Sequence, residues 1–189
     1  QNIVYKGGNL VLGGVDALTM NASGFVTLAG DGTWRMGAKS TQITAPIVTA
    51  ESGVTSTLAA DGTLALSGGE QAAVDVTSSG IGASVNVTGT SVAMDNHWLL
   101  SSGLMSVTAT TGDLQVGEHA LLDASGTHLT VFEKSYYTDG GKIGLTSQQG
   151  NLNIASGAVI DISAQAGGGN AGSIALSAAQ GNLNTHKNL

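Results

Sequence analysis

An internal repeat constrains this chain more than any other feature of its sequence. Residues 141–153 read GKIGLTSQQGNLN and residues 172–184 read GSIALSAAQGNLN, an offset of 31. A longer match, at offset 38, aligns residues 103–125 with residues 141–163. A period of this length is typical of solenoids, in which each repeat buries its apolar side chains only by stacking on its neighbours. The chain is therefore predicted to be one stack of similar units.

Within each unit, apolar residues alternate with polar ones over short runs that Gly, Asn or Ser residues separate. Ile143 and Leu145 form the first run of one unit, and an alternation with period two indicates a half-buried strand. Three such runs per unit predict three strands per coil. Equivalent positions stay apolar from unit to unit, as coils stacked about 4.8 Å apart require. The predicted internal ladders contain Met105, Val107, Leu114, Val116, Ile143, Leu145, Leu152, Ile154, Ile160, Ile162, Ile174 and Leu176.

These patterns predict an all-β, right-handed parallel β-helix that extends as a single domain over residues 1–189. A helical solenoid would need longer stretches that are apolar at i, i+3, i+4 and i+7, and the sequence lacks them. We expect about six coils of this repeat, with the register of residues 1–24 and 66–100 left open. A match at offset 30 aligns Trp34 with Leu64 and predicts that Trp34 points inward. The first strands of the coils are predicted near Val26, Thr57, Val85, Val107, Leu145 and Ile174.

Polar residues recur at one turn of the repeat. Asn151 and Asn182 each follow a Gly, and Asp113 occupies the equivalent place one unit earlier. Gly and Asn tolerate the left-handed backbone of tight turns, and stacked Asn amides can hydrogen-bond along the axis of the coils. A structural role is therefore predicted for these three residues.

Charge and composition exclude several classes of function. The chain has 6 basic and 13 acidic residues, for a net charge of -7, and its Lys and Arg residues are scattered. Nucleic-acid binding needs a clustered positive field, so no nucleic-acid partner is predicted. There is no cysteine, and the four histidines lack the spacing of metal ligands, so neither a metal site nor a cofactor is expected. No run approaches the ~20 apolar residues that span a bilayer, so no transmembrane segment is expected.

Residues 156–184, SGAVIDISAQAGGGNAGSIALSAAQGNLN, and residues 31–53, DGTWRMGAKSTQITAPIVTAESG, resemble the repeat regions of filamentous haemagglutinin-like exoproteins, which two-partner secretion systems export. Similar coils also occur in autotransporter passengers. The resemblance covers most of the chain and implies a shaft segment of a larger protein, secreted to the bacterial cell surface through an outer-membrane transporter partner. The only proline, Pro46, lies in TAPI, so the Asn-Pro-Asn motifs of that family's N-terminal secretion domain are missing.

The resemblance also implies what such a segment does. The implied roles are adhesion, biofilm formation or the carriage of a toxic tip. The implied partner is a host receptor protein, a glycan or a neighbouring cell surface.

A longer interval between coils, residues 126–140, concentrates the few aromatic residues of the chain. Insertions in solenoids form loops on one face, where aromatic side chains commonly anchor partners or sugars. The alternative is that Phe132 and Tyr136 fold back over the coil beneath, or that LTVF adds a short flanking strand. Trp98, in MDNHWLLSS, is interpreted as part of a second exposed loop. The candidate contact residues are Phe132, Glu133, Lys134, Tyr136, Tyr137 and Trp98.

A β-helical polysaccharide-processing enzyme is the alternative class of function. Asp75, Asp123 and Asp161 occupy similar settings, and the last two align in the repeat. Their carboxylates are therefore expected one coil apart, near the spacing that retaining glycosidases use. Each Asp, however, lies between two inward apolar residues and so points outward into water, with no Lys or Arg near it. We therefore predict no catalytic residue and a non-enzymatic scaffold.

Overall fold

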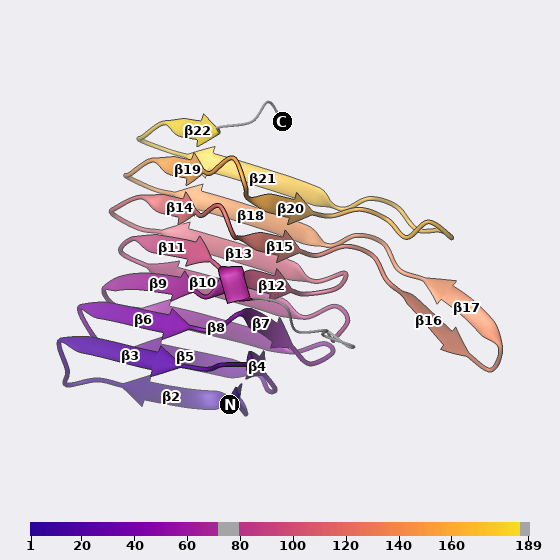
Figure 1. Ribbon diagram of the computed structural model, residues 1–189, viewed down its shortest axis with the longest axis horizontal. Coiled ribbons are helices and arrows are strands. Elements are labelled where there is room, and N and C mark those ends of the chain that lie inside the picture. Colours follow the sequence, from indigo (N-terminus) through magenta and orange to yellow (C-terminus); the bar gives the residue numbers. More distant parts are fainter. Residues whose placement is uncertain (72–79, 186–189) are drawn as a thin grey trace.

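The computed structural model describes residues 1–71 and 80–185. The chain winds through three parallel sheets that form the walls of a rod, which confirms the predicted parallel β-helix (Figure 1). No α-helix occurs among the described residues, and their single helical element is the 3-10 turn η1 (Gly69–Gln71). The fold therefore depends on strand stacking alone.

Each sheet takes one strand from most turns of the chain. Sheet A consists, in spatial order, of β1 (Ile3–Tyr5), β4 (Phe25–Leu28), β7 (Ile47–Ala50), β12 (His97–Leu99), β15 (Leu121–Asp123) and β20 (Val159–Asp161). Sheet B consists of β2 (Gly8–Leu12), β5 (Gly32–Met36), β8 (Thr55–Ala60), β10 (Ser84–Gly89), β13 (Leu104–Ala109), β18 (Lys142–Ser147) and β21 (Ser173–Ala178). Sheet C consists of β3 (Ala17–Asn21), β6 (Ser40–Thr44), β9 (Thr63–Ser67), β11 (Val92–Asp95), β14 (Leu114–Val116), β19 (Leu152–Ile154) and β22 (Leu183–Thr185). A separate antiparallel pair consists of β16 (His128–Val131) and β17 (Lys134–Tyr137).

The number of turns refines the prediction of about six coils. Sheets B and C contain seven strands each, because residues 1–24, whose register was left open, supply an additional first coil. Five of the six predicted first strands lie in sheet B. The exception is Val26, which lies in β4 of sheet A, so that assignment is wrong.

Trp34 is buried in β5 as predicted, but its register neighbour is Leu58 of β8 rather than Leu64. The two segments that match at offset 30 each contain a strand, an Asp-Gly turn and a second strand. They lie at different corners of the rod. Asp31 precedes a strand of sheet B, whereas Asp61 precedes a strand of sheet C. A local match between turns therefore does not fix which sheets the flanking strands join.

Inward side chains form continuous apolar columns along the rod. In sheet B, Val107 pairs with Leu145, which pairs with Leu176, and in sheet C Leu114 pairs with Leu152. Burial alternates along the strands because successive side chains point to opposite faces of a sheet. The buried ladder residues are Met105, Val107, Leu114, Val116, Ile143, Leu145, Leu152 and Ile154. Those at the end of the described coils, which are less buried, are Ile160, Ile162, Ile174 and Leu176.

The recurring polar turn residues link the last coils, which confirms their predicted structural role. Oδ1 of Asp113 accepts a hydrogen bond from the backbone N–H of Asn151 at 2.7 Å, and Oδ1 of Asn151 accepts one from the N–H of Asn182 at 2.9 Å. A Cβ atom on Gly181 would lie 2.2 Å from the carbonyl oxygen of Gly150. Glycine is therefore required where successive turns approach each other this closely.

Sheet A has one strand fewer than the other sheets, because β7 pairs directly with β12. No strand of sheet A comes from the described residues between β9 and β10. At this point Asn96, which is fully buried, joins two turns of the rod. Its Nδ2 donates to the carbonyl oxygen of Ala45 at 3.1 Å, and its Oδ1 accepts from Nε1 of Trp98 at 2.9 Å. The side-chain amide of Asn96 and the indole N–H of Trp98, both buried, therefore have hydrogen-bond partners.

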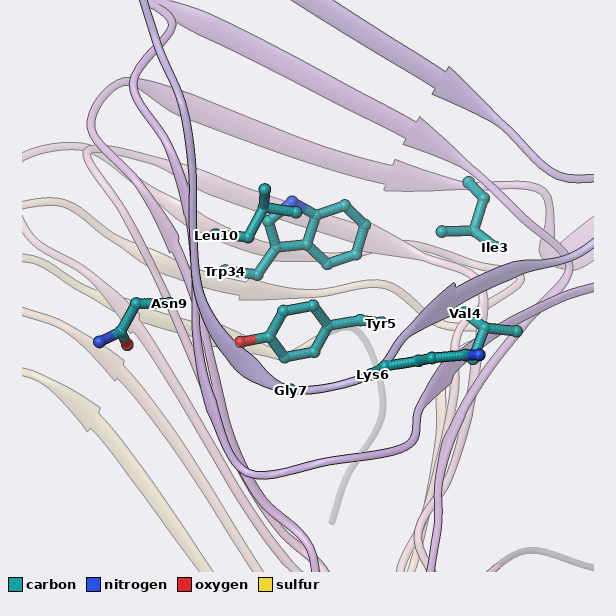
Figure 2. Close-up of a pocket in the computed structure, with 8 residues that line it drawn as sticks. All are labelled: Ile3, Val4, Tyr5, Lys6, Gly7, Asn9, Leu10 and Trp34. Carbon is teal, nitrogen blue, oxygen red and sulfur yellow. The ribbon is translucent and has the colours of Figure 1, made fainter.

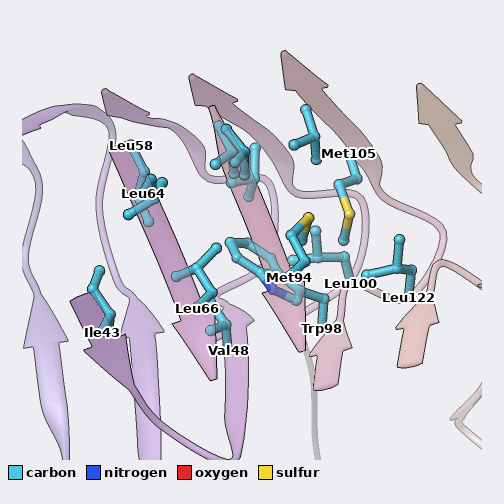
Figure 3. Close-up of a cluster of buried hydrophobic side chains, with 14 of the residues drawn as sticks. Ile43, Val48, Leu58, Leu64, Leu66, Met94, Trp98, Leu100, Met105 and Leu122 are labelled. Atoms are coloured by element: carbon cyan, nitrogen blue, oxygen red, sulfur yellow. The ribbon is translucent and has the colours of Figure 1, made fainter. Parts of the chain in front are cut away.

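The placement of Trp98 on an exposed loop is wrong. Trp98 lies in β12 with 0% of its surface exposed, between Val48 and Leu122 in sheet A. Figure 3 shows its indole among the apolar side chains of the core. The polar residues next to Trp98 in the sequence suggested an exposed loop, but Asn96 points inward and accepts the hydrogen bond of the indole N–H. Trp98 stabilises the core and is not available to a ligand.

Candidate contact hairpin

The predicted loop 126–140 contains the hairpin of β16 and β17, which leaves the coils between β15 and β18 and projects to one side of the rod (Figure 1). Its strands pair in the register His128 with Tyr137, Leu129 with Tyr136, Thr130 with Ser135 and Val131 with Lys134. The aromatic residues therefore do not fold back over the coil beneath. They stand on an arm of regular backbone structure.

The turn at the tip of the hairpin has an unfavourable sequence. Phe132 and Glu133 connect the strands, and both have positive φ, at 48° and 63°. A two-residue connection with this geometry is a type I′ turn, which Asn-Gly favours, whereas the left-handed conformation costs other residues roughly 1–2 kcal/mol each. Phe132 is also 96% exposed, so its ring gains no packing energy from this chain. Strained and exposed residues of this kind cluster at functional sites.

The two faces of the hairpin differ in polarity, since residues directly opposite each other in an antiparallel pair share a face. One face carries Leu129, Val131 and Tyr136, all substantially exposed, together with Lys134. We call this set, with Phe132 at the tip, the apolar face. The opposite face carries His128, Tyr137, Thr130 and Ser135.

Hydrogen bonds fix the base of the hairpin to the rod. The backbone N–H of Thr138 donates to the carbonyl oxygen of Thr127 at 2.9 Å, and the N–H of Thr127 donates to Oγ1 of Thr138 at 2.8 Å. Oγ1 of Thr138 also lies 2.6 Å from Oγ of Ser102. The direction of the hairpin is therefore set at its base.

A second segment, residues 163–172, supports the hairpin from the next turn of the chain. The backbone N–H of Gly126 donates to the carbonyl oxygen of Ser163 at 2.8 Å, and Nε2 of Gln165 donates to the carbonyl oxygen of Gly126 at 2.8 Å. The N–H of Asn170 donates to Oδ1 of Asp139 at 2.7 Å. This segment therefore ties both ends of the insertion.

The aromatic ring of Tyr137 lies against residue 167. A Cβ atom on Gly167 would lie 2.3 Å from the Tyr137 ring, so the ring would have to move if residue 167 carried a side chain. Because Tyr137 belongs to the polar face, the supporting segment contacts that face. The apolar face is left uncovered.

The structure brings five of the six candidate contact residues together on the hairpin: Phe132, Glu133, Lys134, Tyr136 and Tyr137. Trp98 lies in the core. Leu129 and Val131 were not among the candidates, although alternating apolar residues on both sides of a two-residue turn are a hairpin signal. Phe-Glu is not a recognisable turn pair, so the sequence did not reveal the second strand.

The aligned carboxylates of the enzyme alternative have structural partners. Asp123 and Asp161 pair in sheet A. Oδ1 of Asp123 accepts the N–H of Ser125 at 2.8 Å, and Oδ1 of Asp161 accepts the N–H of Ser163 at 2.8 Å. Each carboxylate thus closes its own turn. Asp75 lies outside the described residues.

Two hollows on the rod lack the groups that such an enzyme needs. One, of about 390 Å³, lies at the first coil, where Tyr5 stacks on Trp34 with ring centroids 5.6 Å apart, and Lys6 is its one charged lining residue (Figure 2). The other, of about 490 Å³, lies on the outer face of sheet C, with Asp113 as its one charged lining residue. Neither combines a pair of carboxylates with a basic side chain.

Charged pairs occur on the surface of the rod, away from the hairpin. Arg35 contacts Asp61 through its Nε at 2.9 Å, and Nδ1 of His119 lies 3.2 Å from Oδ2 of Asp95. The hydrogen bond to Asp95 raises the pKa of His119, whereas desolvation lowers the pKa of His97. Within residues 1–71 and 80–185, no three His, Asp or Glu side chains form a group that could hold a metal ion.

The fold and the hairpin define the class of protein to which this chain belongs: a parallel β-helix that carries a projecting antiparallel hairpin. Comparison with known protein families, curated proteins and solved structures gave no match. In the part of the chain that the structure describes, no helix has the length and apolar character needed to cross a membrane.

Proposed function

We propose that this chain is a non-enzymatic, adhesive segment of a secreted bacterial surface fibre, and that the β16–β17 hairpin is its contact element. The observation that carries the proposal is Phe132, an almost fully exposed aromatic residue at a strained turn. Neither its exposure nor its backbone conformation stabilises the chain. Contact with another molecule would account for both.

The rod supports the proposal as a rigid carrier of the hairpin. Apolar columns run through all three sheets, and the strands of successive turns pair along the rod. Close-packed interiors transmit force with little deformation. An insertion that is hydrogen-bonded to such a rod keeps a defined direction.

The location and the partners of the chain are proposed on the resemblance to filamentous haemagglutinin-like exoproteins. On that basis the parent protein is exported through an outer-membrane transporter and remains at the cell surface. The hairpin then meets a host protein, a glycan or a neighbouring cell. The absence of cysteine is compatible with an extracellular repeat protein, because repetition supplies its core.

A binding experiment tests the proposal. The chain would be applied to an array of glycans, host extracellular proteins and immobilised copies of the chain itself. The variant F132S/Y136S removes two aromatic side chains from the hairpin, and T130A/S135A, on the opposite face, is the matched control. We expect binding to at least one array component, weakened roughly tenfold or more by F132S/Y136S and unchanged by the control.

Two results would overturn the proposal. One is that the unaltered chain binds no component of the array. The other is that binding occurs but survives F132S/Y136S unchanged, which would move the contact away from the hairpin.

A further inference from the structure

The apolar face of the hairpin, defined above, carries Lys134 and four apolar residues that no described part of the rod covers: Leu129, Val131, Phe132 and Tyr136. Their exposed fractions are 44%, 45%, 96% and 54%. An uncovered apolar face on a projecting arm marks an interaction surface. Resting on the proposed function, which makes the hairpin the contact element, we propose that this face pairs with the same face of a second copy of the chain in a two-fold contact.

The area of the face agrees with a weak contact between copies. These four side chains offer on the order of 500 Å² per copy, or roughly 1,000 Å² for a pair, which is near the lower limit for specific interfaces. A two-fold contact uses the same surface of both copies, so the apolar residues of one hairpin meet the apolar residues of the other. We therefore expect weak pairing of isolated chains, with multivalency strengthening it where many copies are displayed together.

The charge distribution favours this location for a contact between copies. The whole chain carries a net charge of -7, so two rods repel each other over most of their surface. Residues 127–138 contain one acidic residue, Glu133, and one basic residue, Lys134. The hairpin is therefore a neutral arm on an acidic rod, and it can meet its copy while the rods stay apart.

The geometry of the supporting segment leaves this face free. Gly167 contacts Tyr137, which lies on the polar face, and Gln165 and Asn170 hold the base of the insertion. The side-chain hydrogen bonds that join this segment to the insertion involve Gly126 and Asp139 and not Leu129, Val131 or Tyr136. A second copy can therefore approach the apolar face without displacing the segment that orients the hairpin.

Sedimentation equilibrium of the full chain, with hairpin amides followed by NMR, tests the proposal. We expect reversible dimers with a dissociation constant between about 100 µM and about 1 mM, and stronger pairing at higher salt, because salt screens the repulsion between rods. L129E and L129K each place a charge on the apolar face and should abolish dimers. An equimolar mixture of the two variants should restore them, because opposite charges then meet across the contact. T130A/S135A should pair like the unaltered chain.

Dimers restored in the mixture of L129E and L129K would identify the partner as a second copy of the chain. A chain that stays monomeric at about 1 mM overturns the inference, and hairpin-dependent binding to a glycan or host protein would then leave the proposed function standing. Dimers that persist in both single variants also overturn it, because they form elsewhere, for example through the strand edges of the first or last coil. Hairpin-dependent binding to phosphatidylcholine vesicles without dimers would assign the face to a lipid surface instead, and likewise overturn it.

Discussion

Nε1 of Trp98 donates a hydrogen bond to Oδ1 of Asn96 at 2.9 Å in the interior of the rod, where both residues are fully buried. Nδ2 of the same Asn96 donates to the carbonyl oxygen of Ala45, 51 residues earlier in the chain. One amide thus satisfies two buried groups at the place where β7 pairs directly with β12. This arrangement joins the early and late coils where sheet A omits a strand.

Replacement of Asn96 tests this junction. Asn96→Ala leaves the indole N–H and the Ala45 carbonyl without partners, and we expect it to lower the free energy of unfolding by about 2–4 kcal/mol. Urea denaturation measures the change. Asn184→Ala, which removes an exposed amide that hydrogen-bonds Asn153, is the control and should change stability little. Equal effects of the two substitutions would contradict a special role for Asn96.

The histidines predict two opposite dependences of stability on pH. Because Asp95 raises the pKa of His119, the stabilisation from that pair is complete below the unfolded pKa near 6.5 and is lost as the pH rises through the folded value. Because desolvation lowers the pKa of His97, its neutral form is favoured, and the folded state loses stability as the pH falls below about 6.5. NMR titration should place the two pKa values on opposite sides of the ordinary value. His119→Gln should remove the first dependence and leave the second, and a shared midpoint would refute the assignment.

The residues at the tip of the hairpin are expected to destabilise the turn and to support partner binding. F132N/E133G introduces the pair that a type I′ turn favours, so we expect slower amide exchange in β16 and β17, by a factor that corresponds to about 1–3 kcal/mol. The same variant should lose partner binding, because Phe132 is gone. E133G alone keeps the Phe132 ring and relieves the strain at one position, so it should slow amide exchange less than the double variant. Faster exchange in F132N/E133G would argue against the turn strain.

The contact between Gly167 and Tyr137 predicts that the supporting segment orients the hairpin. Gly167→Ala forces the ring to move, because the new Cβ would lie 2.3 Å from it. We expect faster exchange of the hairpin amides with global stability nearly unchanged. Gly13→Ala, whose Cβ would meet no atom within 4 Å, is the control. Unchanged exchange in the Gly167 variant would show that the hydrogen bonds at the base suffice.

Several features of the fold followed directly from the repeats. Ungapped matches at offsets 31 and 38 correspond residue by residue to the parallel register, in which Met105 pairs with Ile143 and Ile143 with Ile174. These alignments give the correct register because each inward residue of a β-helix lies over its counterpart, and each ungapped match joins equivalent strands of successive coils. Near Trp34, which pairs with Leu10 and Leu58, the match at offset 30 instead aligned a strand of sheet B with a strand of sheet C, and it therefore selected the wrong partner.

The sequence by itself determined the parallel β-helix, the ladders of its last coils and the position of the insertion, because local alternation and repetition encode them. Only the tertiary structure decided the burial of Trp98 and the two-faced hairpin that carries Phe132. Burial of Trp98 depends on Val48 and Leu122, which lie far from it in sequence, and on an Asn side chain that turns inward. The hairpin depends on a turn that its own residues disfavour, so its backbone hydrogen bonds and its base, rather than local propensity, set its conformation.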